Sequence, residues 1–411
     1  MLVVELAVPA PDTDFQAHRL WARQLISTGS ISISDDGRWD DCSIYYPNTV
    51  PKPAELVQLL AGELAGGGVA HAFIRIALAF AAASLAARAA LRASGSARTS
   101  VLAGLAFGLN PAFVGLCRAG SPSVPFLALL MVEAWPATLA ACLVRPEAFI
   151  YSAARAVARR KWLILPALLP LAAVWPLLNL WMAGNPLWSV LEVRYAVRAM
   201  PYETPGALGF WLWAAARALL VMGPLLLAAL VARPRGWPWL AGGVGHLAFL
   251  SASLLVGSLA LPRYVDQIFL LAIPWAVASG AKMRLPRWLP RPAAAGLALC
   301  GAMTLWPSAL SAMGRDHRLQ EGLEAAGRRG WEGRLAANEL LIPAIALSAG
   351  MDDPRSRFVA LDRMVFEGAS PSSLGVGLIL LAPGTEYLPE RTALWLESHA
   401  GIPIDTVEAA R

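Results

Sequence analysis

The sequence is poor in charge, and this excludes an ordinary soluble globular protein. Charged residues make up 15% of the 411 residues and hydrophobic residues 57%, whereas soluble domains contain about 25% and about 45–50%. The mean hydropathy of +0.53 agrees with this composition. The sequence therefore predicts a protein that crosses a membrane several times.

Metal-ligand motifs, disulfide patterns and nucleotide-binding motifs are also missing. The four cysteines show no CxxC or Cys/His spacing, so the sequence indicates neither a zinc site nor a disulfide framework. No glycine-rich phosphate-binding motif is present, which argues against ATP or soluble nucleotide-sugars as substrates. No cofactor is indicated with certainty, and a divalent metal such as Mg²⁺ or Mn²⁺ stays an open alternative.

Apolar runs of the length that spans a bilayer, about 17–25 residues, occupy the middle of the chain. We predict about eight spans, at residues 69–93, 101–117, 121–144, 162–183, 208–232, 238–260, 264–280 and 293–313. In the run 121–144, Pro136 and the stretch "VRPEAF" can instead divide the segment into short helices that meet near one membrane face. The predicted fold is an all-α polytopic membrane bundle over residues 69–313.

The basic residues of the connecting loops predict the orientation of this bundle. One set of loops holds Arg88, Arg92, Arg98, Arg155, Arg159, Arg160, Lys161, Arg233, Arg235, Lys282, Arg284, Arg287 and Arg291. The alternate set holds Arg118, Arg194, Arg198 and Arg263, joined by Arg145 if "RPE" turns outward. The positive-inside rule places the richer set in the cytoplasm, so the basic pI needs no nucleic-acid partner.

The two ends of the chain differ from this middle part. Residues 1–68 read as a first external loop, in which Ala17, Leu20, Trp21 and Leu25 recur at helical spacing. We expect a helix lying in the membrane interface, with Trp21 at headgroup level. The apolar start "MLVVELAVPA" is too short to span a bilayer, and we expect the natural reading frame to begin earlier with a further transmembrane helix.

The tail, residues 314–411, is predicted to form a small extracytoplasmic α/β domain. The stretches "HRLQEGLEAAGRR" and "RTALWLESHAG" read as helices, and "RFVALD" and "GVGLILLAP" read as strands. About 95 residues suffice for a modest hydrophobic core.

Several stretches resemble, in the same order, the GT-C membrane glycosyltransferases. "DTDFQAHRLWARQL" resembles their first external loop, with its DxD-like acidic motif, and "YYPNTVPKPAELVQLLAG" the turn and short helix that close it. Bacterial relatives of glycosyltransferase family 39, the protein mannosyltransferase type, have stretches similar to "GLNPAFVGLCRAGSPSVPFLALL", "CLVRPEAF", "LWMAGNPLWSV" and "LPRYVDQIFLLAIPW". The resemblance covers roughly residues 11–280.

This resemblance implies an inverting enzyme of the bacterial cytoplasmic membrane that works on the outer face. The donor would be a polyprenyl-phosphate-linked sugar and the acceptor a glycan, a lipid or a protein, with membrane lipids as further partners. A carboxylate would take the acceptor's proton, a general-base role worth typically 10²–10⁴-fold. Arginine would stabilise the leaving phosphate, because its planar fork matches phosphate oxygens.

The first external loop supplies candidates for both roles. Asp12 and Asp14 are the candidate catalytic acids, and the alternative is that they only cap the helix and complement its dipole. His18 is a candidate for substrate binding on the face of Asp14, or else an interface residue. Lys52, held between two prolines, either presents its ammonium to a phosphate or lies in solvent.

Ionisable residues inside predicted spans are costly and therefore functional candidates. Arg217 is placed to meet a lipid phosphate or to pair with Glu133, while Arg75 and Arg263 either bind substrate or snorkel to the outer surface. Asp266 either pairs with Arg263 or binds sugar hydroxyls.

Two further sequence features complete the candidates. In the external loop 184–206, Arg194 and Tyr195 suit sugar binding, although aromatic residues also gather at membrane interfaces. Arg145 and Glu147 of "RPE" are interpreted as an internal ion pair beside a helix break and not as a site. Two other function classes stay open: a transporter or flippase for a lipid-linked glycan, and a non-catalytic scaffold of envelope assembly.

Overall fold

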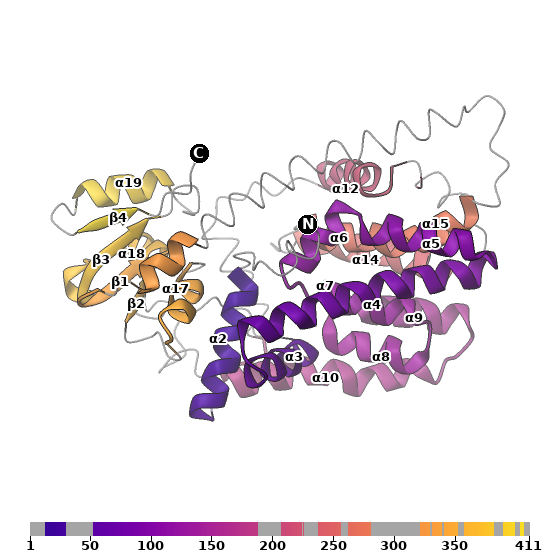
Figure 1. Ribbon diagram of the computed structural model, residues 1–411, viewed down its shortest axis with the longest axis horizontal. Helices are drawn as coiled ribbons and strands as arrows, with labels where there is room; N and C mark the ends of the chain where they lie inside the picture. The colour runs from indigo at the N-terminus through magenta and orange to yellow at the C-terminus, as the bar shows by residue number, and fades with distance from the viewer. Residues whose placement is uncertain are drawn as a thin grey trace.

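The protein consists of a helical bundle and a small α/β unit at one end of it (Figure 1). The structure is a computed structural model that describes residues 13–29, 52–187, 207–223, 225, 237–255, 262–280, 321–328, 331–338, 341–351, 357–381, 389–398 and 403–406. Over these residues it confirms the mostly helical fold and the α/β tail.

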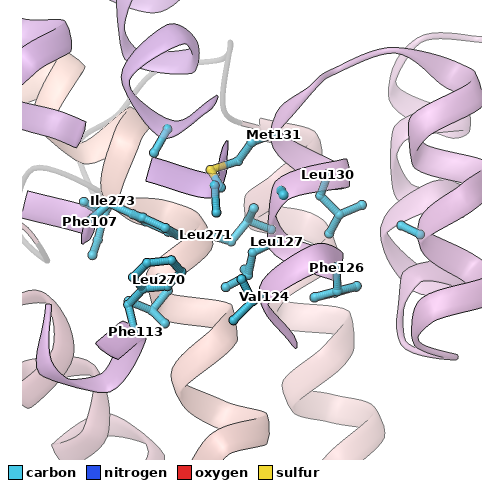
Figure 2. Close-up of a cluster of buried hydrophobic side chains, with 14 of the residues drawn as sticks. Phe107, Phe113, Val124, Phe126, Leu127, Leu130, Met131, Leu270, Leu271 and Ile273 are labelled. Atoms are coloured by element: carbon cyan, nitrogen blue, oxygen red, sulfur yellow. The ribbon is translucent and has the colours of Figure 1, made fainter. Parts of the chain in front are cut away.

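From α3 to α10, the helices before the α/β unit follow one another with short connections. The helices before this unit are α2 (Thr13–Thr28), α3 (Pro53–Leu64), α4 (Gly68–Ser94), α5 (Ala97–Gly108), α6 (Pro111–Arg118), α7 (Ser123–Met131), α8 (Trp135–Val144), α9 (Ala148–Ala158), α10 (Ile164–Ala183), α12 (Ala207–Met222), α14 (Trp237–Leu255) and α15 (Pro262–Gly280). Their main core joins α5, α6, α7 and α15 through residues such as Phe107, Phe113, Leu127 and Leu270 (Figure 2). This core holds the bundle together through apolar burial.

Two described helices are long and apolar enough to cross a membrane, Gly68–Ser94 and Ile164–Met182. The pair Ala97–Gly108 and Pro111–Arg118, bent by 57°, passes the same test when it is taken as one span. These helices match the predicted segments 69–93, 162–183 and 101–117. The predicted spans that include 293–313 and parts of 208–232 and 238–260 stay predictions, because these residues lie outside the described part of the chain.

The interpretation of residues 121–144 as one crossing is wrong, and the alternative of short helices is correct. The chain ends α7 at Met131, passes Glu133 with a φ of 58°, and starts α8 with Pro136 in its first turn. Proline is well tolerated in the first turn of a helix, since the N–H it lacks has no partner there. A second reversal follows at Arg145, Pro146 and Glu147, before α9.

The turns that join the short helices α7, α8 and α9 lie at the two ends of this part of the bundle. At one end, the Arg92 guanidinium lies 3.6 Å from the Glu133 carboxylate, and Arg155 donates to the Glu133 carbonyl oxygen. Arg92 and Arg155 both belong to the basic set that was expected in the cytoplasm. At the other end, the Arg145 guanidinium donates to the Ser123 hydroxyl over 2.8 Å. We call the end with Arg92, Glu133 and Arg155 the arginine–tryptophan end, and the end with Arg145 and Ser123 the cavity end.

Helix α2 joins the bundle to the α/β unit, and the expected position of Trp21 among lipid headgroups is not observed. Leu20 and Trp21 are fully buried in a cluster with Leu56 of α3 and with residues of the α/β unit such as Ile342. The other face of α2 packs Phe15 and Ala22 against α3. Both faces of the helix are therefore covered by protein, which leaves no apolar stripe for lipid.

The α/β unit contains a four-stranded parallel sheet in the order β2-β1-β3-β4. Its elements are β1 (Arg334–Ala337), α17 (Ile342–Ser348), β2 (Phe358–Ala360), α18 (Leu361–Glu367), a 3₁₀ turn at Ser372–Leu374, β3 (Val376–Leu381), α19 (Pro389–Ser398) and β4 (Ile404–Thr406), and residues 321–328 are also helical. The two predicted strands and two predicted helices are confirmed as β2, β3, residues 321–328 and α19. Sequence reasoning missed β1 and β4.

Candidate functional site

A small polar cavity lies at the cavity end of the bundle. It has a volume of about 60 Å³, room for about four water molecules at roughly 15 Å³ each. Its lining residues come from α2, the start of α3, the α6–α7 loop, the α8–α9 turn and the start of α15: Phe15, His18, Lys52, Glu55, Ala119, Gly120, Ser121, Pro122, Arg145, Arg263 and Tyr264. The fold thus brings together three predicted substrate-binding residues, His18, Lys52 and Arg263.

The start of α3 places Lys52 and Glu55 at the cavity. Pro53 occupies the first turn of the helix, and the Glu55 carboxylate accepts a hydrogen bond from the Lys52 backbone N–H over 3.1 Å. The Lys52 ammonium lies 3.9 Å from the same carboxylate, and the Nδ1 atom of His18 lies 2.8 Å from its other oxygen. Glu55 therefore connects α2 to α3 at the cavity wall.

Glu55 is ionised at neutral pH. Burial of the carboxyl group opposes its charge, but His18 and Lys52 outweigh burial and lower the pKa of Glu55 to about 2. A carboxylate with so low a pKa is a weak general base at neutral pH. Its role at the cavity is to hold His18 and Lys52 in place.

The "RPE" turn places Arg145 on the opposite wall. A residue before proline is restricted to extended conformations, and Arg145 has φ −147° and ψ 135°. The turn brings its guanidinium against Glu147, with Nε donating to one carboxylate oxygen over 3.1 Å and Nη2 to the other over 2.8 Å. The interpretation of "RPE" as an ion pair beside a helix break is confirmed, and the pair also lies at the cavity.

Tyr264, next to Arg263 at the start of α15, brings two cations close together. The guanidinium carbon of Arg145 lies 4.9 Å from the centre of the Tyr264 ring, and that of Arg263 lies 5.5 Å from it. Among the described residues, Lys52, Arg145 and Arg263 bring three cationic side chains to the cavity, and Glu55 and Glu147 lie next to two of them. The cavity is therefore suited to an anion.

The α6–α7 loop closes the cavity from a third side. Gly120 has a φ of +66°, and a Cβ atom there would lie 2.6 Å from the Phe15 ring. Arg75 supports the same wall, since it donates to the Arg118 carbonyl over 2.8 Å and lies 5.4 Å from the Phe15 ring centre. Arg75 is buried instead of snorkelling, and it contacts the wall of the cavity without lining it.

Arg217 and Asp266 bind each other away from the cavity. The Arg217 Nε donates to one Asp266 oxygen over 2.8 Å, and its Nη2 donates to the other. The expected pair of Arg217 with Glu133 does not form, because Glu133 lies at the arginine–tryptophan end with Arg92 and Trp239. Neither Arg217 nor Asp266 lines the polar cavity.

The remaining predicted residues lie outside the described part of the chain. Asp12, Arg194 and Tyr195 are not described, and Asp14 is described only as part of the backbone of α2. Among the described residues, no group of three or more His, Cys, Asp and Glu side chains is arranged to hold a metal ion. The catalytic acids and the divalent metal stay predictions.

Sequence reasoning missed Arg145, Glu55, Ser121 and Tyr264 as residues that line the cavity. The "KPAE" start of α3 carries a signal for Glu55. An acid at the third position of a helix can accept a hydrogen bond from the backbone N–H of the residue that precedes the helix. No family model, curated protein or solved structure matches the chain. The function is therefore inferred from the residues of the site.

Proposed function

We propose that this protein is an integral membrane glycosyltransferase of the GT-C type. It transfers a sugar from a polyprenyl-phosphate donor to a glycan, lipid or protein acceptor on the outer face of the bacterial cytoplasmic membrane. The polar cavity carries this proposal, because His18, Lys52, Arg145 and Arg263 converge there from distant segments. Lysine and arginine are cationic donors that stabilise the charge on a leaving phosphate.

A second hollow suits the lipid chain of such a donor. It is an apolar groove of about 160 Å³ between α4, α5 and α6, lined by Ala79, Phe80, Ala83, Gly104, Leu105, Gly108, Leu109, Phe113, Val114 and Cys117. Cys117 lines the groove, and Ala119, two residues further on, lines the polar cavity. A lipid with its phosphate in the polar cavity therefore has an apolar surface close by.

The proposed reaction is a displacement at the anomeric carbon. Asp12 or Asp14 takes the proton of the acceptor hydroxyl, whose oxygen forms the new glycosidic bond while the bond from the anomeric carbon to the phosphate oxygen breaks. The phosphate leaves with the electron pair, and Arg145 and Arg263 stabilise its negative charge. Glu55 is assigned no role as the base, because its carboxylate is engaged with His18 and Lys52.

The proposed orientation places the cavity end outside the cell. Arg92 and Arg155, at the other end, belong to the basic loops that the positive-inside rule assigns to the cytoplasm. The α/β unit packs on α2, which also lines the cavity, so it lies on the same side.

The test combines glycan analysis of a deletion strain with an assay of the purified protein on polyprenyl-phosphate-sugars. Replacing Asp12 and Asp14 together with Asn is expected to lower sugar transfer by about 10²–10⁴-fold while expression and melting temperature stay unchanged. Unchanged transfer in this variant would remove both acids from the mechanism. A wild-type protein that moves lipid-linked glycan across vesicles without transferring sugar would instead be a flippase, and one that does neither would fit the scaffold.

A further inference from the structure

Arg145 presents unused hydrogen-bond donors to the polar cavity. Its guanidinium has five N–H groups, and three of them donate to the two Glu147 oxygens and to the Ser123 hydroxyl. Within the described chain, the other two N–H groups have no hydrogen-bond acceptor, although the side chain is only 6% exposed. A buried cation with spare donors at a cavity wall is a site for an acceptor from outside the chain.

The orientation of Arg145 is fixed from behind. Glu147 is almost fully buried and lies 3.9 Å from the His246 ring, whose other nitrogen is 3.3 Å from the Tyr151 hydroxyl. The Tyr151 ring in turn packs so closely on Gly242 that a Cβ atom there would lie 2.4 Å from it. The carboxylate that holds Arg145 is thus enclosed by α9 and α14 and has little freedom to move.

We infer that Glu147 positions Arg145 to bind the phosphate group of the donor lipid. The inference rests on the proposed function for the identity of the anion. A guanidinium held in one orientation loses little conformational freedom when it binds an oxyanion, and its N–H fork suits phosphate oxygens. Lys52 and Arg263 line the same cavity and add positive charge.

Binding of a short-chain polyprenyl phosphate to the detergent-purified full chain tests the role of Arg145. Arg145→Gln is expected to weaken binding by about 10- to 100-fold, the usual worth of a hydrogen bond to a charged group. The affinity of Arg145→Lys is expected to lie between those of the wild type and of Arg145→Gln, since an ammonium is a point charge without the planar fork. Unchanged affinity in Arg145→Gln overturns the inference.

Arg155 provides a matched control at the other end of α9. It is also a buried arginine with hydrogen bonds to a turn, made to Thr138 and Glu133. Arg155→Gln is expected to leave the affinity within about twofold of wild type, because it lies at the end opposite to the cavity. Equal losses of affinity in Arg145→Gln and Arg155→Gln would show a general structural effect and overturn the inference.

A double-mutant cycle tests the positioning role of Glu147. Glu147→Gln is expected to weaken binding by about three- to tenfold when Arg145 is present and to have no further effect in Arg145→Gln, since coupled residues are not additive. If Arg145→Gln does not fold, Arg145→Lys takes its place in the cycle. The same loss with and without the arginine overturns the positioning role.

Two comparisons separate this inference from a site for free phosphate and from the proposed function. Inorganic phosphate is expected to compete for the site but to bind more weakly than the lipid, because it lacks the apolar chain; equal affinities would overturn the assignment to a lipid. Lipid binding through Arg145 without any sugar transfer would end the proposed function and leave this inference intact. Full sugar transfer by Arg145→Gln would do the reverse.

Discussion

The two ends of the bundle use the same residue types in different ways. Each has a helix reversal with a proline and an arginine–carboxylate pair. At the cavity end, the Arg145 and Glu147 side chains are 6% and 8% exposed. At the arginine–tryptophan end, the Arg92 and Glu133 side chains are 42% and 26% exposed. The first pair is desolvated, and only there does removal of one partner leave a buried charge.

Arg155, the second arginine of the arginine–tryptophan end, shows how an arginine with a packing role differs from one at a binding site. Arg155 donates to the Glu133 carbonyl and the Thr138 hydroxyl, and its guanidinium lies 4.5 Å from the Trp135 ring centre and 5.9 Å from that of Trp239. Arg155 lies against two tryptophan rings, whereas Arg145 lies against the single ring of Tyr264 and also lines a cavity. An arginine marks a binding site when its remaining donors face a hollow, and the residue type alone does not.

The largest expected effect comes from breaking the buried pair. Glu147→Ala leaves Arg145 as a buried charge without its carboxylate, and such a change costs about 3–5 kcal/mol of unfolding free energy. Denaturant unfolding in detergent measures this loss. A cost below about 1 kcal/mol would show that water reaches the pair and would erase the contrast between the ends.

Two glycines with positive φ give the next contrast. Gly120, at the cavity, would place a Cβ atom 2.6 Å from the Phe15 ring, whereas Gly95, after α4, has no heavy atom within 4 Å of that position. Gly95→Ala is expected to cost about 1 kcal/mol from backbone strain. Gly120→Ala adds overpacking and is expected to cost about 3 kcal/mol. Equal melting temperatures for the two variants would contradict the packing of Phe15 on this loop.

The dependence of stability on pH tests the cavity wall at Glu55. Its pKa is about 2 in the folded protein, against 4.5 for a free group, so its stabilisation is complete above pH 4.5 and is lost as the pH falls toward 2. The loss is on the order of 3 kcal/mol. Melting curves between pH 2 and 6 should be flatter for Glu55→Gln than for wild type. Parallel curves would show that His18 and Lys52 do not hold this carboxylate.

The smallest effect is expected at the arginine–tryptophan end. Glu133→Gln removes a partly exposed ion pair with Arg92 and is expected to change the unfolding free energy by less than about 1 kcal/mol. Urea unfolding beside Glu147→Ala provides the measurement. A loss as large as that of Glu147→Ala would mean that both ends are equally desolvated.

Local sequence signals predicted the features that depend on neighbouring residues. Hydropathy located α4 and α10, and the proximity of Arg145 to Glu147 across one proline predicted their ion pair. The pair of Arg217 with Asp266 was missed because hydropathy gives the length of a helix and not its rotation against a distant one.

Only part of the candidate site was predicted from the sequence, since Arg145, Glu55 and Tyr264 were not among the predicted site residues. His18, Lys52 and Arg263 were each singled out from their local surroundings, yet their meeting at one cavity depends on how α2, α3 and α15 pack. The burial of Trp21 shows the same limit, since an amphipathic pattern does not tell whether lipid or protein covers the apolar face. Glu55 was missed because it also fits an ordinary helix start.

The most direct test of the account is an experimental structure of the protein with a short-chain polyprenyl phosphate bound. The account predicts phosphate density in the polar cavity, within hydrogen-bond distance of Arg145 and next to Lys52 and Arg263, with the lipid chain leading toward the apolar groove. Density for the phosphate at another place, with the Arg145 donors facing an empty cavity, would contradict it.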